Sequence, residues 1–127
     1  MRPSKTAQLA KIAQIAFQAD HARMAELQRL EERFLAQIED VRRHERAARE
    51  RAPDTMSFAG RDHLWERWIE ARLSALQTEL AQVKARKADL LSDMRKSFGR
   101  KVAADSLAAS VKAREALERA RRATWTE

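Results

Sequence analysis

The 127-residue sequence contains no cysteine and no tyrosine, and only two glycines, two prolines and 6% aromatic residues. The absence of cysteine excludes disulfides and thiolate chemistry and allows a reducing compartment. No run of about 18 apolar residues occurs, so we expect no transmembrane segment. The segment after Met1 is amphipathic and interrupted by Lys11, unlike the apolar core of a signal peptide. We therefore expect a cytoplasmic protein.

The residues that are abundant are those that favour helices. Charged residues make up 35% of the chain, and Ala, Leu, Glu, Arg, Lys and Gln dominate. Large apolar residues recur at regular spacing, which a disordered chain of similar charge would lack. The composition is therefore typical of a long helix or a coiled coil within one domain.

A single stretch is built to break a helix, and it lies at residues 52–60 with Pro53 and Gly60 inside it. It predicts a helix over about 4–52, a turn over 53–61 and a second helix over about 62–124. Ser4 or Thr6 would cap the first helix, and Asp62 the second. We expect an all-α fold, a long antiparallel two-helix coiled-coil hairpin that forms a single domain over 1–127. Dimerisation of extended chains through the same stripes stays open, so the protein would be a monomer or a homodimer.

Each predicted helix has an apolar stripe with steps of mostly three and four residues. Four-residue steps at Leu30, Phe34 and Ile38 depart from a strict heptad, Lys87 occupies a seam position where it can fix the register, and Gly99 is the place for a kink or break. The first stripe comprises Leu9, Ile12, Ala16, Met24, Leu27, Leu30, Phe34, Ile38 and Val41. The second comprises Trp65, Ile69, Leu73 (or Arg72), Leu76, Leu80, Val83, Leu90, Met94 and Phe98, with Val102, Leu107, Val111 and Leu117 continuing it weakly.

The net charge of +7 is concentrated in the second half, where residues 61–127 hold 15 basic and 10 acidic side chains. Folded back on the first helix, the second would extend about ten to fifteen residues beyond it. This overhang, Ala113–Glu127, carries Arg114, Arg119, Arg121, Arg122 and Trp125. A basic surface favours nucleic acid, anionic lipid or an acidic protein face, and the alternative is a solvated coiled-coil exterior.

No arrangement of residues suggests catalysis. His21, His44 and His63 are isolated from one another, and no spacing resembles a metal site. A glycine-rich phosphate loop and a nucleophile–base pair are both missing. We expect a protein that is not an enzyme, with no catalytic residue, cofactor or metal.

A tryptophan pair, Trp65 and Trp68, follows the predicted turn. Both rings could close the hairpin tip over Phe58 and Val41. Alternatively they form an exposed anchor with Arg67 and Arg72, because tryptophan and arginine dominate interface hot spots. Trp125 has little core to join, so it is either a partner contact or part of a frayed end.

Binding of nucleic acid is an alternative because the pI is near 10.5. Basic residues are, however, interleaved with acidic ones, and no DNA-reading module matches.

The order of features resembles the flagellar and type III secretion export stalk proteins, the FliJ/YscO family. The similarity lies in size, hairpin organisation and the Arg-rich end of the second helix, residues 113–125. It implies an adaptor that inserts its helix termini into a hexameric export ATPase and contacts the export gate or substrate chaperones. Localisation would be cytoplasmic, or peripheral at the inner membrane through a complex. The residues that would meet the ATPase are Leu9, Ile12, Ile15, Arg119, Arg121, Arg122 and Trp125. A general coiled-coil scaffold is the second interpretation.

Overall fold

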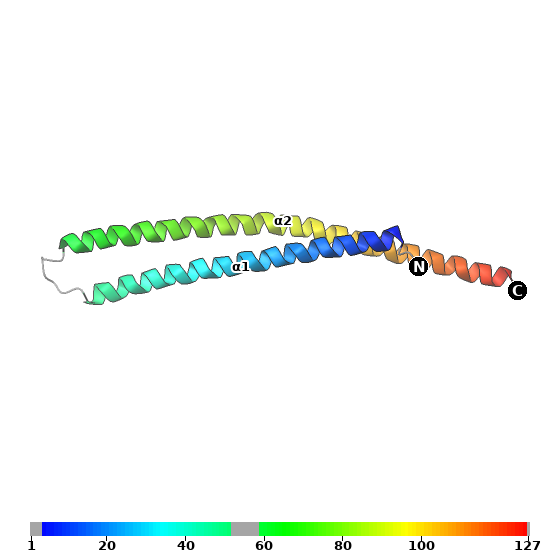
Figure 1. The fold of residues 1–127 in the computed structure, drawn as a ribbon, viewed down its shortest axis with the longest axis horizontal. Coiled ribbons are helices and arrows are strands. Elements are labelled where there is room, and N and C mark those ends of the chain that lie inside the picture. The colour runs from blue at the N-terminus through cyan, green and yellow to red at the C-terminus, as the bar shows by residue number, and fades with distance from the viewer. Residues whose placement is uncertain (1–3, 52–58, 127) are drawn as a thin grey trace. The chain divides into compact units, whose positions relative to one another are not determined.

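The computed structural model describes residues 4–51 and 59–126, and these residues are almost entirely helical. Helix α1 spans Lys5–Arg51 and helix α2 spans Ala59–Trp125 (Figure 1), with no strand in either described range. The all-α antiparallel two-helix hairpin predicted from the sequence is thus confirmed. Tertiary contacts divide the chain into two units, which we call the terminal unit (Met1–Met24 with Leu90–Glu127) and the central unit (Ala25–Asp89).

Within each unit the two helices run antiparallel. In the central unit Glu31 contacts Lys87, whereas Ile38, further along α1, packs with Leu76 and Leu80, which come earlier in α2. In the terminal unit Asp20 hydrogen-bonds Ser97. The groove residues of that unit follow the same direction, with Leu9 and Leu107 sharing its wall.

The positions that face the partner helix follow a heptad, and we call them the seam. Their steps alternate between three and four residues, as in a left-handed coiled coil, except at the start of α2, where Trp65, Ile69 and Leu73 follow one another at four-residue steps. On α1 the seam consists of Thr6, Ala10, Ala13, Phe17, Asp20, Met24, Leu27, Glu31, Phe34, Ile38, Val41, Glu45 and Ala48, all buried or half-buried. On α2 it consists of Trp65, Ile69, Leu73, Leu76, Leu80, Val83, Lys87, Leu90, Met94, Ser97, Lys101, Ala104, Ala108 and Val111.

The structure differs from the predicted stripes in two places. In α1 Glu31 is half-buried as well as Leu30, so a regular three–four alternation runs through Glu31 beside the predicted four-residue steps at Leu30, Phe34 and Ile38. In the part of the terminal unit nearest the start of α1, several seam positions are Ala or Ser, namely Ala10, Ala13, Ser97, Ala104 and Ala108, and not the larger residues that the stripe assumed there. Leu9, Ile12, Ala16, Phe98, Val102 and Leu107 are exposed instead. A continuous helix keeps its phase, so small residues occupy the seam wherever the heptad places them.

Two polar pairs cross the seam. Lys87 Nζ donates a hydrogen bond to Glu31 Oε2 at 2.6 Å, and Ser97 Oγ donates one to Asp20 Oδ2 at 2.7 Å. Any shift of one helix along the other would separate these partners and leave half-buried polar groups unpaired. The register role predicted for Lys87 therefore has a structural basis, because Glu31 lies directly opposite.

The helix ends agree with the prediction at the start of α1 and differ at the start of α2. Ser4 caps α1, because its Oγ accepts a hydrogen bond from the Ala7 amide at 3.2 Å. Helix α2 begins at Ala59, earlier than the predicted start near residue 62, so the positions of Gly60 and Asp62 lie within the helix. The predicted turn residues 53–58, including Phe58, lie outside the described residues.

Helix α2 continues through Gly99, so the structure has no break at that position. The cost of one glycine in a helix is about 1 kcal/mol, which strong helix formers on both sides offset. A Cβ placed on Gly99 would meet nothing within 4 Å. No close approach of neighbouring atoms therefore requires a glycine at this position, and the helix is continuous there.

Candidate interaction surface

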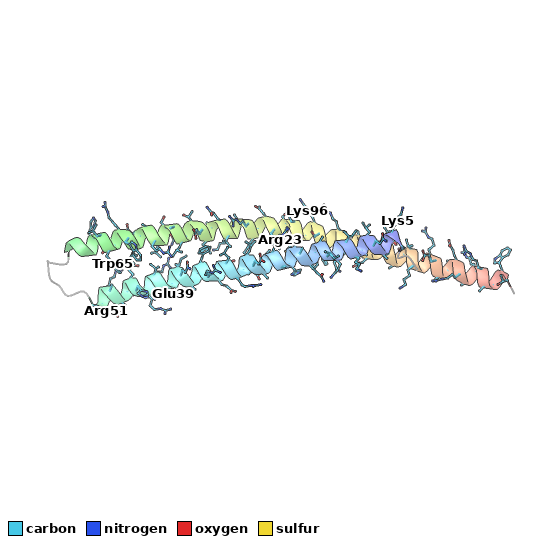
Figure 2. The ribbon with its side chains drawn as sticks, in the orientation of Figure 1. Lys5, Arg23, Glu39, Arg51, Trp65 and Lys96 are labelled. Carbon is cyan, nitrogen blue, oxygen red and sulfur yellow. The ribbon has the colours of Figure 1, made fainter. Side chains whose placement is uncertain are left out.

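The central unit is closed around an apolar core. Ile38, Leu76 and Leu80 form a buried cluster, which Phe34, Val41 and Leu73 cover from the sides, and Ile69 and Val83 are also buried. The side chains of both helices meet along this seam (Figure 2). The unit contains 13 basic and 13 acidic residues, so its net charge is zero. The central unit thus has a closed apolar core and equal numbers of basic and acidic residues.

The terminal unit has a much thinner core. Only Leu90 and Ala104 are buried among its described residues. Nine of the twelve exposed large hydrophobic side chains belong to it, whereas three belong to the central unit. The nine are Leu9, Ile12, Ile15, Leu91, Phe98, Val102, Leu107, Leu117 and Trp125. Among the described residues, exposed large apolar side chains are thus concentrated in the terminal unit.

The terminal unit also carries the whole net charge of the protein. Its sequence holds 13 basic and 6 acidic residues, a net charge of +7, against zero in the central unit. Charge and exposed apolar area therefore coincide in one unit. A surface of this kind attracts partners that are both acidic and apolar.

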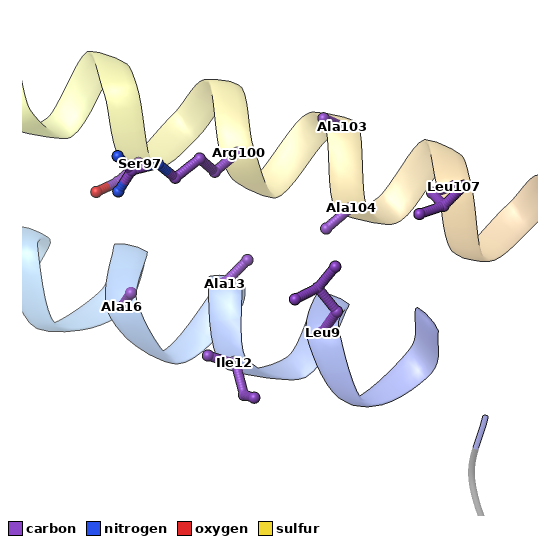
Figure 3. Close-up of a pocket in the computed structure, with 9 residues that line it drawn as sticks. All are labelled: Leu9, Ile12, Ala13, Ala16, Ser97, Arg100, Ala103, Ala104 and Leu107. Atoms are coloured by element: carbon purple, nitrogen blue, oxygen red, sulfur yellow. The ribbon is translucent and has the colours of Figure 1, made fainter. Parts of the chain in front are cut away.

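A groove of about 440 Å³ lies between the helices of the terminal unit. It exists because the seam positions there, Ala13 and Ala104, have short side chains that leave space between the helices (Figure 3). Leu9 and Ala104 point toward one another across it in Figure 3. Its lining residues are Leu9, Ile12, Ala13 and Ala16 from α1 and Ser97, Arg100, Ala103, Ala104 and Leu107 from α2.

An aromatic contact joins the same two helices beside this groove. The rings of Phe17 and Phe98 lie 5.7 Å apart, and Phe17 also meets His21 edge-on at 4.8 Å. Phe98 and His21 stay exposed. None of these three residues lines the groove.

The N-terminal residues predicted to bind a partner separate into two groups. Leu9 and Ile12 line the groove, whereas Ile15, although 58% exposed, does not. Every described residue from 112 to 126 is exposed, which agrees with the predicted overhang. Within it Arg121, Arg122 and Trp125 lie together on one helix surface with Glu118. Arg114 and Arg119 are exposed as well.

The tryptophan pair of the central unit is split between core and surface. Trp65 is half-buried in the seam, whereas Trp68 is 59% exposed, so the two rings do not act together as a cover. Arg72 is exposed one helical turn after Trp68. Trp68 and Arg72 thus remain available at the surface.

The sequence interpretation missed several groove residues, namely Arg100, Ala13, Ala103 and the groove role of Leu107. Alanines were overlooked because the apolar stripe was built from large side chains. The available signal was the strict heptad of the central unit, since extending its phase along each helix identifies the alanine seam and the residues beside it.

In the described ranges no group of three or more His, Asp or Glu residues could hold a metal ion. The structure also contains no buried side-chain N or O atom without a hydrogen-bond partner in those ranges. Neither described helix is long and apolar enough to cross a membrane. No protein-family model, curated protein or solved structure matches this chain.

Proposed function

We propose that this protein is a non-enzymatic coiled-coil adaptor that binds other proteins through its terminal unit. The observation that carries the proposal is the coincidence of the net charge of +7 and nine exposed large hydrophobic side chains in that one unit. The central unit, with a closed core and no net charge, serves to hold the helices in register.

Within this class we propose a stalk protein of a flagellar or type III protein export apparatus. The resemblance in hairpin organisation and in the Arg-rich end of α2 supports this assignment. The first helical turns of α1 and the last turns of α2 would engage the hexameric export ATPase, and other helical surfaces would contact the export gate or chaperones. The protein would be cytoplasmic and reach the inner membrane only through that complex.

The end of α2 supplies the residue types that dominate protein interfaces. Trp125 is 88% exposed and lies beside Arg121 and Arg122. Tryptophan and arginine are enriched among hot-spot residues because the indole ring buries a large area and the guanidinium donates several hydrogen bonds. We expect these three side chains to contribute more of the binding free energy than Ala123 and Thr124 between them.

The proposal is tested by measuring binding of the purified chain to the export ATPase of the same organism by analytical ultracentrifugation. Truncation after Ala113 should abolish the complex, because the hot-spot residues are lost. Helicity per residue and melting temperature should change little, since every described residue that is removed is exposed. Failure of the full-length chain to bind the ATPase rejects the stalk function. A large loss of stability on truncation rejects the view that the overhang is free for docking.

Non-specific nucleic-acid binding is the second candidate, and the +7 charge of the terminal unit favours it. Binding to random duplex DNA should then persist near physiological salt. Loss of binding at that salt removes this candidate while leaving the adaptor function untouched.

A further inference from the structure

The groove of the terminal unit is shaped to accept side chains from a third helix. Seven of its nine lining residues are apolar, and only Ser97 and Arg100 are polar. Four alanines form much of its wall (Figure 3), so knobs from another helix can enter between α1 and α2. A lipid bilayer surface has no such ridge of side chains to fill a concave groove.

One arginine lines the groove, and two more lie at heptad spacing from its lining residues. On α2, Arg100 and Leu107 line the groove, and Arg114 follows Leu107 by seven residues. On α1, Leu9 and Ala16 line the groove, and Arg23, which pairs with Asp20 at 3.8 Å, follows Ala16 by seven residues. Arg100 is therefore the cation placed to meet a carboxylate of a helix in the groove.

The net charge of the terminal unit favours some classes of binding partner for this groove over others. A second copy of the chain would bring one +7 unit against another, and like charges across an interface disfavour association. Nucleic acid would need several cations in the groove, where only Arg100 is present. An amphipathic helix with apolar residues on one face and carboxylates beside them satisfies both the apolar lining and Arg100.

We propose that the groove between Leu9, Ile12 and Leu107 binds an acidic amphipathic helix of a partner protein, with Arg100 pairing one of its carboxylates. The inference rests on the proposed adaptor function and specifies the chemistry of the partner. The complex would be a three-helix coiled coil over the length of the groove.

Two designed peptides of about three heptads test the proposal. Both have Leu at the a and d positions, and they differ in having Glu or Lys at the e and g positions. Anisotropy of the labelled peptides is measured with the full-length protein at about 0.15 M salt. The acidic peptide should bind at least about tenfold more tightly than the basic one. Equal affinities, or no binding of the acidic peptide, overturn the proposal.

Matched variants locate the binding site. Ile12→Glu and Ile15→Glu change residues of the same helix that are 64% and 58% exposed, but only Ile12 lines the groove. Leu107→Glu and Val102→Glu form a second matched pair, at 48% and 49% exposure, of which only Leu107 lines the groove. The groove variants and Arg100→Glu should weaken acidic-peptide binding at least about tenfold, and the two control variants less than about twofold. Equal effects within each pair overturn the proposal.

Three further measurements separate other occupants. Sedimentation of the protein alone reports a homodimer that Ile12→Glu dissociates. Binding to anionic phosphatidylserine vesicles and to duplex DNA is measured with both isoleucine variants. If Ile12→Glu weakens either binding and Ile15→Glu does not, the groove holds a lipid or a nucleic acid. Each of these results overturns the acidic-helix proposal. If the protein binds the export ATPase but not the acidic peptide, only the groove proposal is rejected. If it binds the acidic peptide but not the ATPase, only the stalk function is rejected.

Discussion

At the residue scale, burial in the central unit is concentrated in a few leucine, isoleucine and valine side chains. Leu76 is the most completely enclosed of them at 2% exposure, and it packs with Ile38 and Leu80. Full burial of a side chain of this size is worth about 1.5–3 kcal/mol. The stability of a two-helix protein therefore depends on few positions.

Leu76→Ala should lower the free energy of unfolding by about 2–4 kcal/mol, because it removes buried methyl groups and leaves a cavity in the central core. Leu35→Ala is the control, since Leu35 is 47% exposed in the same unit and should cost less than about 1 kcal/mol. Urea unfolding followed by circular dichroism measures both. Similar losses for the two variants would contradict the assigned core.

A second prediction at this scale concerns the pair of Lys87 and Glu31, whose side chains are only 27% and 20% exposed. Lys87→Glu places two carboxylates opposite each other and should lower the unfolding free energy by about 2 kcal/mol. Adding Glu31→Lys restores opposite charges and should recover most of the loss. Thermal melts of the two single variants and the double variant provide the comparison. An additive double variant would mean that the residues do not interact.

At the element scale, α2 is continuous although it contains a glycine and a change in seam composition. Large apolar seam residues give way to Ser97, Lys101 and Ala104 near that glycine. Helix propensity and the heptad both continue, so the backbone has no reason to break. What changes along the element is the size of the groove beside it, not the path of the helix.

Gly99→Ala should therefore raise the free energy of unfolding by about 0.5–1 kcal/mol, because the site is helical and its Cβ direction is open. Ala103→Gly on the same helix is the control and should have the opposite sign. Denaturant unfolding measures both variants. Destabilisation by Gly99→Ala would show that the helix bends or breaks there in solution.

At the scale of the whole molecule, stability and binding capacity are assigned to different units. The central unit holds most of the buried apolar residues and no net charge, whereas the terminal unit holds few buried residues and all of the net charge. Segments with few buried contacts open at low free energy, and binding surfaces are often drawn from them. Partner binding is thus expected to stabilise the terminal unit most.

Hydrogen exchange should distinguish the two units. Amides of residues 9–22 should be at least about tenfold less protected than those of residues 29–44, because none of their four seam residues is fully buried and two of them are alanine. The acidic peptide should raise protection of residues 9–22 with little effect on 29–44. Equal protection along α1 in the free protein would mean that both units unfold together.

The sequence alone determined the two helices and the antiparallel fold class, because a proline–glycine segment separates two strongly helix-forming stretches. It also identified the central core, from Phe34 to Val41 and from Ile69 to Val83, where large apolar residues coincide with the heptad. It placed the start of α1 at Ser4, whose side chain accepts the expected capping bond.

Only the tertiary structure decided which face of each helix end meets its partner. Near the termini the large apolar residues do not coincide with the heptad, so composition favoured Leu9 and Ile12 as core. The phase of the helix instead buries Ala104 and half-buries Ala13, leaving the larger side chains beside a groove. Packing between two helices depends on which residues the heptad turns toward the partner helix, as well as on hydrophobicity. Long-range pairs such as Glu31 with Lys87 fix which residues these are.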